Sequence, residues 1–101
     1  MAAYYILTHT ITDLERYQRE YIPGTGRILA KHQGQLLAVS LQAEVLDGNP
    51  PGGVAVVRFP TEEAVRAFVH DPEYAPLKKI RLESTTNSSA VLVPEFKMPG
   101  S

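Results

Sequence analysis

A Gly- and Pro-rich segment in the middle of the chain, residues 47–53, separates two stretches of strand-type sequence, residues 35–47 and 54–59. Such a composition forms turns, and it leaves too few residues for the helical crossover that parallel neighbours require. The two stretches are therefore expected to pair antiparallel, as a hairpin.

Helical stretches flank the predicted hairpin, and a further strand lies beyond each of them. Aromatic and β-branched residues alternate in residues 3–11, which favours a strand, and residues 90–93 form the last apolar stretch. Apolar residues recur at helical spacing within residues 14–32 and again within residues 64–80. The resulting order, β-α-β-β-α-β, predicts an α+β fold of the ferredoxin-like type: a four-stranded antiparallel sheet with two helices on one face.

Local signals predict where the first helix begins and ends. Thr12 followed by Glu15 is a capping-box pattern, so the helix should begin there. Pro23 and Gly24 interrupt the helical spacing, and we expect a kink or a break because proline lacks an amide donor. Gly34 is placed to end the helix in the left-handed conformation.

The second helical stretch carries two start signals. Thr61 precedes two acidic residues and is predicted to cap the first segment. Asp71 followed by Pro72 predicts that a second segment starts there, with the aspartate as cap and the proline in the first helical position. Tyr74 in that segment is expected to face the core.

The predicted strands are apolar on both faces, whereas the two helices cover only one face. A second copy of the chain is the simplest cover for the other face, so we expect a homodimer. The length of 101 residues suits one domain, predicted over residues 1–94, followed by a C-terminal tail at residues 95–101.

Composition and charge exclude several function classes. Ten basic and eleven acidic residues give a net charge of −1, so there is no basic excess for nucleic-acid binding. The absence of cysteine excludes disulfides and thiolate metal sites. No apolar run is long enough to span a membrane, and the N-terminus lacks signal-peptide features, so we expect a cytoplasmic protein without membrane partners.

Neither a metal nor a cofactor is expected from the motifs. The three histidines, His9, His32 and His70, lack the spacing of metal ligands on one helix or strand. No glycine-rich phosphate loop precedes a predicted helix.

His9 and Asp13 are the candidate catalytic residues. His9 lies near the end of the first predicted strand, and a histidine titrates close to neutral pH, so it could move a proton. Asp13 could orient the imidazole. The alternative is that His9 is a surface or partly buried side chain and that Asp13 caps the helix.

Tyrosine and arginine side chains are the candidate ligand contacts. Tyr17 and Tyr21 lie one helical turn apart and could form the wall of a binding site, or they could simply be core residues. Arg58 could bind an anion while Glu44 on the preceding strand holds it in place, or it could be a charge at the rim of the strand. Arg81 could bind a carboxylate or could be a charge at the end of the helix.

The order and spacing of several motifs resemble those of a known family. The motifs are Tyr4-x-Ile6, Thr12-Asp13, Tyr17-x-x-x-Tyr21, His32-x-Gly34, Val45-Leu46-Asp47-Gly48, Arg58-Phe59-Pro60 and Asp71-Pro72-Glu73-Tyr74-x-x-Leu77-x-x-x-Arg81. Over about residues 4–94 the chain thus resembles domain-of-unknown-function family 1330, within the dimeric α/β-barrel superfamily. The segment from Arg58 to Arg81 is the most specific part of the match.

The resemblance implies two ferredoxin-like subunits packed sheet to sheet, with a cleft between sheet and helices in each. The superfamily includes cofactorless monooxygenases, lactone isomerases, haem-handling proteins and stress-response proteins. We therefore expect the cleft to bind a small organic acid, with cofactorless proton-transfer or oxygenase/isomerase-type chemistry as the candidate activity. The alternative is a non-enzymatic homodimeric module with a regulatory or stress-response role.

Overall fold

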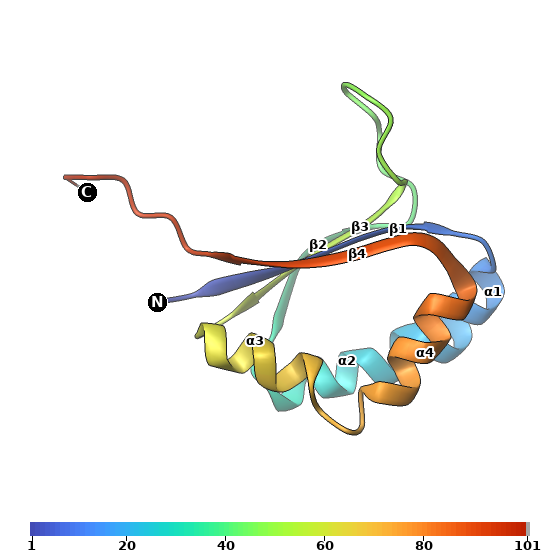
Figure 1. Ribbon diagram of the computed structural model, residues 1–101, viewed down its shortest axis with the longest axis horizontal. Coiled ribbons are helices and arrows are strands. Elements are labelled where there is room, and N and C mark those ends of the chain that lie inside the picture. Colours follow the sequence, from blue (N-terminus) through green and yellow to red (C-terminus); the bar gives the residue numbers. More distant parts are fainter. Residues whose placement is uncertain (101) are drawn as a thin grey trace.

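Four strands form one antiparallel sheet in the order β2-β3-β1-β4 (Figure 1). The structure is a computed structural model, and it describes residues 1–100. The strands are β1 (Ala3–Ile11), β2 (Gln35–Ser40), β3 (Gly53–Phe59) and β4 (Thr85–Pro94). The predicted hairpin is confirmed, because β2 and β3 pair antiparallel across the Gly- and Pro-rich segment.

The helices lie together on one face of the sheet, below it in Figure 1. The first helical stretch is continuous and consists of α1 (Leu14–Arg16), the π-helical η1 (Tyr17–Tyr21) and α2 (Ile22–Lys31). The second consists of α3 (Glu62–Val69) and α4 (Ala75–Ser84). This arrangement confirms the predicted ferredoxin-like βαββαβ fold.

The register of the sheet determines which side chains face the helices. In β1, Tyr5 and Leu7 are buried and lie opposite Val57 and Ala55 of β3. Alternate residues of the same strands point to the outer face, away from the helices. The helix-side core is a single cluster of buried residues: Ala3, Tyr5, Leu7, Tyr17, Tyr21, Ile28, Val57, Phe59, Val65, Phe68 and Tyr74.

The helical stretch continues through Pro23, where a kink or a break was predicted. Instead, the turn just before the proline widens into the π-helical segment η1, closed by a bond from the Ile22 N–H to the Tyr17 carbonyl. The proline then lies in the first turn of α2, where a missing N–H costs least. Gly24 allows a close approach of α4, because a Cβ there would lie 2.9 Å from a methyl group of Leu77, which would have to move.

Two helix ends differ from the predicted caps. Asp13, and not Thr12, caps the first helix, because its side chain accepts the Arg16 N–H at 3.2 Å. At the end of α2, Gln33 adopts the left-handed conformation with φ 62°, and Gly34 donates its N–H to the Leu29 carbonyl at 2.7 Å. Gly34 is needed for packing, since a Cβ there would meet the Phe59 ring at 2.9 Å.

Two element boundaries also differ from the prediction, and one agrees with it. β2 ends at Ser40 rather than at residue 47, because the Ser40 hydroxyl accepts the Gln42 N–H and turns the chain. Thr61 caps α3 as predicted, through the Ala64 N–H. Asp71 instead holds a turn, accepting the Glu73 N–H at 2.8 Å, and α4 begins only at residue 75.

The last strand is longer than predicted and leads directly into the tail. β4 begins at Thr85 and pairs with β1 along its whole length, with an irregularity opposite His9. After Pro94, the Glu95 N–H bonds to the Ala2 carbonyl at 3.0 Å, and the chain then extends away from the sheet (Figure 1). Phe96 and Met98 of this tail are exposed, and residue 101 lies outside the described residues.

No helix within residues 1–100 is both long enough and apolar enough to cross a lipid bilayer.

Candidate functional site

A pocket with an almost wholly apolar lining, which we call the main pocket, lies between the first helical stretch and the helix-side face of the sheet. Its volume is about 330 Å³. It is lined by Tyr5, Leu7, Tyr17, Tyr21, Ile22, Thr25, Gly26, Leu29, Leu36, Val39, Leu41, Ala55, Val57 and Phe68. All of these are neutral and most are aliphatic or aromatic, so the pocket is suited to an uncharged apolar molecule.

The pocket opens toward the edge strand of the sheet. Leu36 and Val39 of β2 line it, yet 52% and 57% of their surfaces remain exposed. The residues that line its inner wall, Leu7 and Val57, are buried. A ligand could therefore enter past β2 and reach a wall formed by β1 and β3.

Tyr17 and Tyr21 both line the pocket and are both buried, so wall and core roles coincide in them. Their rings lie 5.0 Å apart at η1. The Tyr21 hydroxyl is 2.8 Å from the Tyr74 hydroxyl. Burial raises the pKa of both hydroxyls, which keeps them protonated as donors.

His9 does not line the pocket, but it contacts Tyr17, which does. Its ring contacts Tyr17 edge-on, with centroids 5.1 Å apart, and it covers Gly53, where a Cβ would lie 2.9 Å from the imidazole. The side chain is buried, and no described residue hydrogen-bonds to its Nδ1. Burial, together with the charge of Arg81, lowers the pKa of His9 to about 4, so the imidazole is neutral at pH 7.

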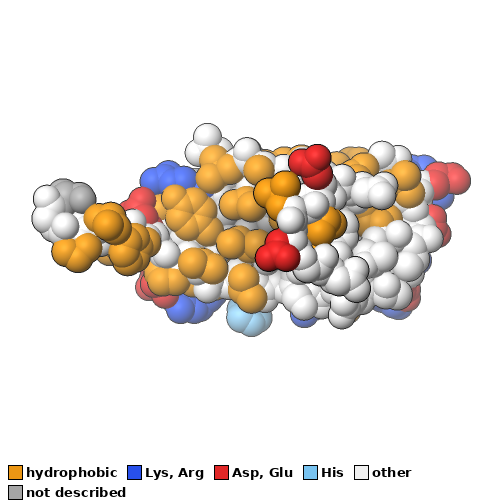
Figure 2. Space-filling view, turned by 90° about the horizontal axis from the view of Figure 1, so that it is seen from above, with side chains coloured by type: hydrophobic (Ala, Val, Ile, Leu, Met, Phe, Trp, Pro, Cys, Tyr) orange, Lys and Arg blue, Asp and Glu red, His pale blue; other side chains and the backbone are white. Residues whose placement is uncertain are grey.

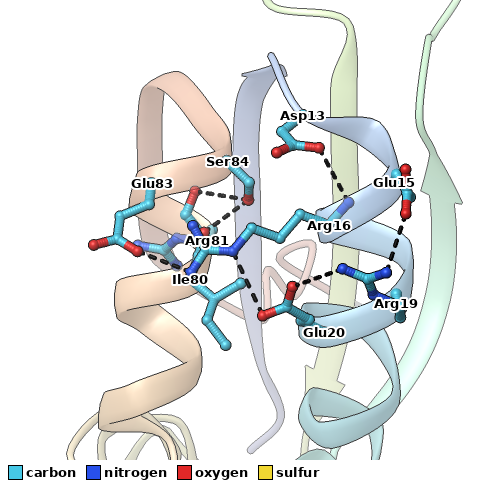
Figure 3. A network of polar contacts seen from close by, with 9 residues as sticks. All are labelled: Asp13, Glu15, Arg16, Arg19, Glu20, Ile80, Arg81, Glu83 and Ser84. Carbon is cyan, nitrogen blue, oxygen red and sulfur yellow. Dashed lines mark hydrogen bonds and ion pairs between the residues drawn. The ribbon is translucent and has the colours of Figure 1, made fainter.

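Asp13 does not orient His9. Its carboxylate faces the start of the first helix, where it caps the Arg16 N–H (Figure 3). The same Arg16 donates to Glu83 at 2.9 Å and so ties this helix to α4. Because Asp13 is exposed and occupied as a cap, the predicted His9–Asp13 pair is wrong, and the alternative role of Asp13 as a helix cap is correct.

Arg58 and Glu44 do not belong to the pocket. Arg58 lies opposite Tyr4 in the sheet and points to the outer face, whereas His9 lies opposite Gly53 and points to the helices. Glu44 is exposed in the loop next to Gly52, and Arg58 lies five residues along β3 from Gly53, or about 16 Å. The predicted pairing of Arg58 with Glu44 is therefore wrong, as is their predicted place in the cleft.

Arg81 is buried rather than exposed at a helix end, with only 5% of its surface accessible. Its Nη1 donates to the hydroxyls of Tyr5 and Tyr74, at 3.0 and 3.1 Å. Arg81 thus contacts Tyr5, which lines the pocket, but it does not line the pocket itself. Because Arg81 belongs to α4, its hydrogen bond to Tyr5 links this helix to the wall of the pocket.

Sequence reasoning missed Tyr5 and the aliphatic lining. Tyr5, Leu7 and His9 alternate along one strand, so their common face could have been found from the period of two. Arg81 follows Tyr74 by seven residues, two helical turns, which also places both on one face. The pocket is lined jointly by η1, α2 and the sheet, which are distant in the sequence, so no local signal predicts it.

Residues 1–100 hold no cluster of three or more histidine or acidic side chains that could bind a metal.

Comparison with known proteins supports the fold and the family. The family model described as Domain of unknown function (DUF1330) matches residues 2–96. No curated protein matches the sequence.

Solved structures resemble the chain at low sequence identity. The RPA0582 protein of unknown function from Rhodopseudomonas palustris is 15% identical with a TM-score of 0.78, covering 96% of this chain and 84% of its own. SnoaB from Streptomyces nogalater, described as a cofactor-independent oxygenase, is 13% identical with a TM-score of 0.68, covering 99% and 98%. A dimeric ferredoxin-like protein of unknown function from Thermobifida fusca is 14% identical with a TM-score of 0.56, covering 94% and 92%.

These structures show that the fold is shared, and the match over nearly the whole sequence shows that the chain belongs to the DUF1330 family.

Proposed function

We propose that the protein binds a neutral aromatic organic molecule in the pocket between η1, α2 and the sheet. The observation that carries the proposal is the pocket of about 330 Å³ with an uncharged, largely apolar lining. Aromatic rings at Tyr17 and Phe68 and flat aliphatic surface at Ala55 and Val57 suit a planar ring system.

The same lining argues against the organic acid expected from the sequence. An anionic head group in the pocket would leave water without meeting a cation, because Arg58 lies on the outer face and Arg81 behind the tyrosines. Tyrosine hydroxyls can instead donate to a neutral oxygen. A phenol or an aromatic ketone is therefore the ligand class that we favour.

Thermal unfolding with 2-naphthol and with 2-naphthoate tests the proposal. Both probes have the same ring system, but only the naphthoate carries a charge. We expect 2-naphthol to raise the Tm in a saturable way and 2-naphthoate to have a much smaller effect. Ala55→Phe should fill the pocket and abolish the response, whereas Gly26→Ala, at a lining position where a Cβ meets no atom, should retain it.

Cofactorless proton transfer on such a ligand is the second candidate function. The specific observation in its favour is the buried, neutral His9 beside Tyr17, with Nδ1 free of partners within the described chain. The likeness to SnoaB, described as a cofactor-independent oxygenase, is consistent with chemistry that needs only protein side chains. The imidazole would accept a proton from carbon next to a carbonyl, with the Tyr17 hydroxyl donating to the carbonyl oxygen.

Hydrogen–deuterium exchange at the carbon next to the carbonyl of 2-tetralone, followed by NMR in deuterated water, tests this second function. The wild-type protein should accelerate the exchange, and His9→Asn should remove the acceleration without changing 2-tetralone binding. Binding without acceleration would leave the non-enzymatic module as the function.

We also propose that the outer face of the sheet pairs with a second copy of the chain. Hydrophobic side chains gather on this face (Figure 2), and Val91 and Val93 remain 52% and 40% exposed. They continue the partly buried apolar residues Ile6 and Val56 of the neighbouring strands. The relative from Thermobifida fusca is described as dimeric, which is consistent with this arrangement.

A further inference from the structure

A second cavity lies on the other side of Tyr5, between α4 and β4. Its volume is about 370 Å³, and its lining is Tyr5, Val69, Tyr74, Lys78, Arg81, Leu82, Ser88 and Ala90. Two of these residues are cationic and none is acidic. The chemistry of this cavity therefore differs from that of the uncharged main pocket.

The buried guanidinium of Arg81 has no acidic partner among residues 1–100. Every described ion pair is formed by other residues, and the contacts of Arg81 are the neutral hydroxyls of Tyr5 and Tyr74. A buried cation is costly unless an opposite charge compensates it. The tyrosines satisfy Nη1 but leave the charge uncompensated.

Two polar atoms of this region are buried without a hydrogen-bond partner in the described chain. They are the Nε of Arg81 and the Oγ of Ser88, and both residues line the cavity. Such atoms in a folded protein normally contact an ordered water, an ion or a ligand. The Nε–H lies on an edge of the guanidinium that can form bidentate hydrogen bonds with an oxyanion.

Ser88 lies next to an irregularity in β4. Thr8 pairs with Ser89 and Thr10 with Thr86, so two residues of β4 stand opposite His9. Asn87 takes a positive φ of 56° at this bulge. Ser88 precedes the helix-side residue Ala90 by two positions, so the alternation of the strand places its side chain on the face toward α4.

From these observations we propose that the cavity between α4 and β4 is a binding site for a small oxyanion, a carboxylate or a phosphate. Arg81 Nε and Ser88 Oγ are its buried donors, and Lys78 lies at its exposed side. A water molecule could satisfy the two donors but could not neutralise the guanidinium. An oxyanion does both, and the site is separate from the main pocket.

The test follows the Arg81 Nε–H resonance by NMR in ¹⁵N-labelled protein during titration with benzoate and with inorganic phosphate, against chloride at equal ionic strength. We expect a saturable shift with at least one of the two oxyanions and none with chloride. Tighter benzoate binding assigns the site to organic carboxylates, and tighter phosphate binding assigns it to phosphate.

Matched variants localise the site. Ser88→Ala should weaken binding about five- to tenfold, since it deletes one hydrogen-bond donor. Lys78→Gln should weaken it about threefold, whereas Lys79→Gln, a neighbouring exposed lysine outside the cavity, should leave it unchanged. Equal losses in the two lysine variants, or no saturable shift with either oxyanion, would overturn the proposal.

Ala55→Phe separates this proposal from that of the main pocket. The variant should lose 2-naphthol binding but keep oxyanion binding, because Ala55 lines only the main pocket of the two. Loss of both ligands would show that the two cavities are not independent, and would overturn the second site.

Discussion

The hydroxyls of Tyr21 and Tyr74 lie 2.8 Å apart and join the two helical stretches that cover one face of the sheet. Tyr74 also accepts from Arg81 at 3.1 Å, and Arg81 continues to the Tyr5 hydroxyl of the central strand. The chain of contacts therefore runs from the wall of the main pocket to the second cavity. Both proposed sites depend on this buried tyrosine–arginine cluster.

The cluster predicts a graded effect of changes at Tyr74. Tyr74→Phe should lower the free energy of unfolding by about 1–3 kcal/mol, because Tyr21 and Arg81 each lose a buried partner. Tyr74→Ala should cost about 3–5 kcal/mol, because the ring is only 1% exposed. Urea unfolding measures both. Tyr4→Phe on the outer face is the control, and a cost below about 0.5 kcal/mol for Tyr74→Ala would contradict the packing.

His9 predicts acid sensitivity of the fold. Its pKa is lowered from 6.5 to about 4 in the folded state, so between these values the unfolded chain binds more protons. The stabilisation is full above pH 6.5 and decreases as the pH falls toward 4, by up to about 3 kcal/mol. In the wild type, the free energy of unfolding should therefore fall with a clear slope as the pH is lowered across this range. His9→Gln should remove this slope, whereas His70→Gln, at an exposed side chain, should keep it. An identical slope in His9→Gln would contradict the assignment.

Asp71 links the turn before α4 to the end of α2 through hydrogen bonds and ion pairs. Its carboxylate lies 2.7 Å from His32 Nε2 and 2.9 Å from Lys31 Nζ, and it accepts the Glu73 N–H. These contacts, with His32 first, hold the pKa of Asp71 well below its usual range, so their stabilisation is full above about pH 4 and is lost as the pH falls further.

Asp71→Asn should therefore lower the free energy of unfolding at pH 7 by about 1–3 kcal/mol. Glu73→Gln is the matched control, because Glu73 is exposed and only joins the Lys31 ion pair at 3.3 Å. Its cost should stay within about 0.5 kcal/mol. Equal costs for the two variants, by urea unfolding, would refute the role of Asp71.

The proposed dimer predicts a mass of about twice 11.1 kDa in sedimentation at micromolar concentration. Val56→Lys places a charge in the middle of the outer face and should give a folded monomer. Ala67→Lys, on the exposed side of α3, should remain dimeric. A wild-type monomer would show that the outer face is exposed to solvent.

The fold was predictable because local signals and the order of elements agree. The hairpin at the Gly- and Pro-rich segment, the alternation in β1 and the cap at Thr61 each follow from nearby residues. Boundaries were less predictable where tertiary contacts contribute to them. Asp71, the predicted cap of the last helix, instead contacts Lys31 of α2 and His32 just after it, and α4 starts later.

The candidate site was only partly predictable. Tyr17 and Tyr21 reach the pocket because their helical face is set by periodicity. Arg58 does not, because the register pairs it with Tyr4, and one step along a strand reverses the face of a side chain. The burial of Arg81 depends on hydroxyls contributed by residues 7 and 76 positions away in the sequence.

Intermolecular NOEs from 2-naphthol test the central claim most directly, because neighbouring residues of β3 report on opposite faces of the sheet. Ala55 and Val57 face the pocket, whereas Val56 faces the outer side. We predict NOEs from the naphthol ring protons to the methyl groups of Ala55 and Val57 and none to those of Val56. NOEs to Val56 alone, or no NOEs at saturating 2-naphthol, would contradict binding in the pocket.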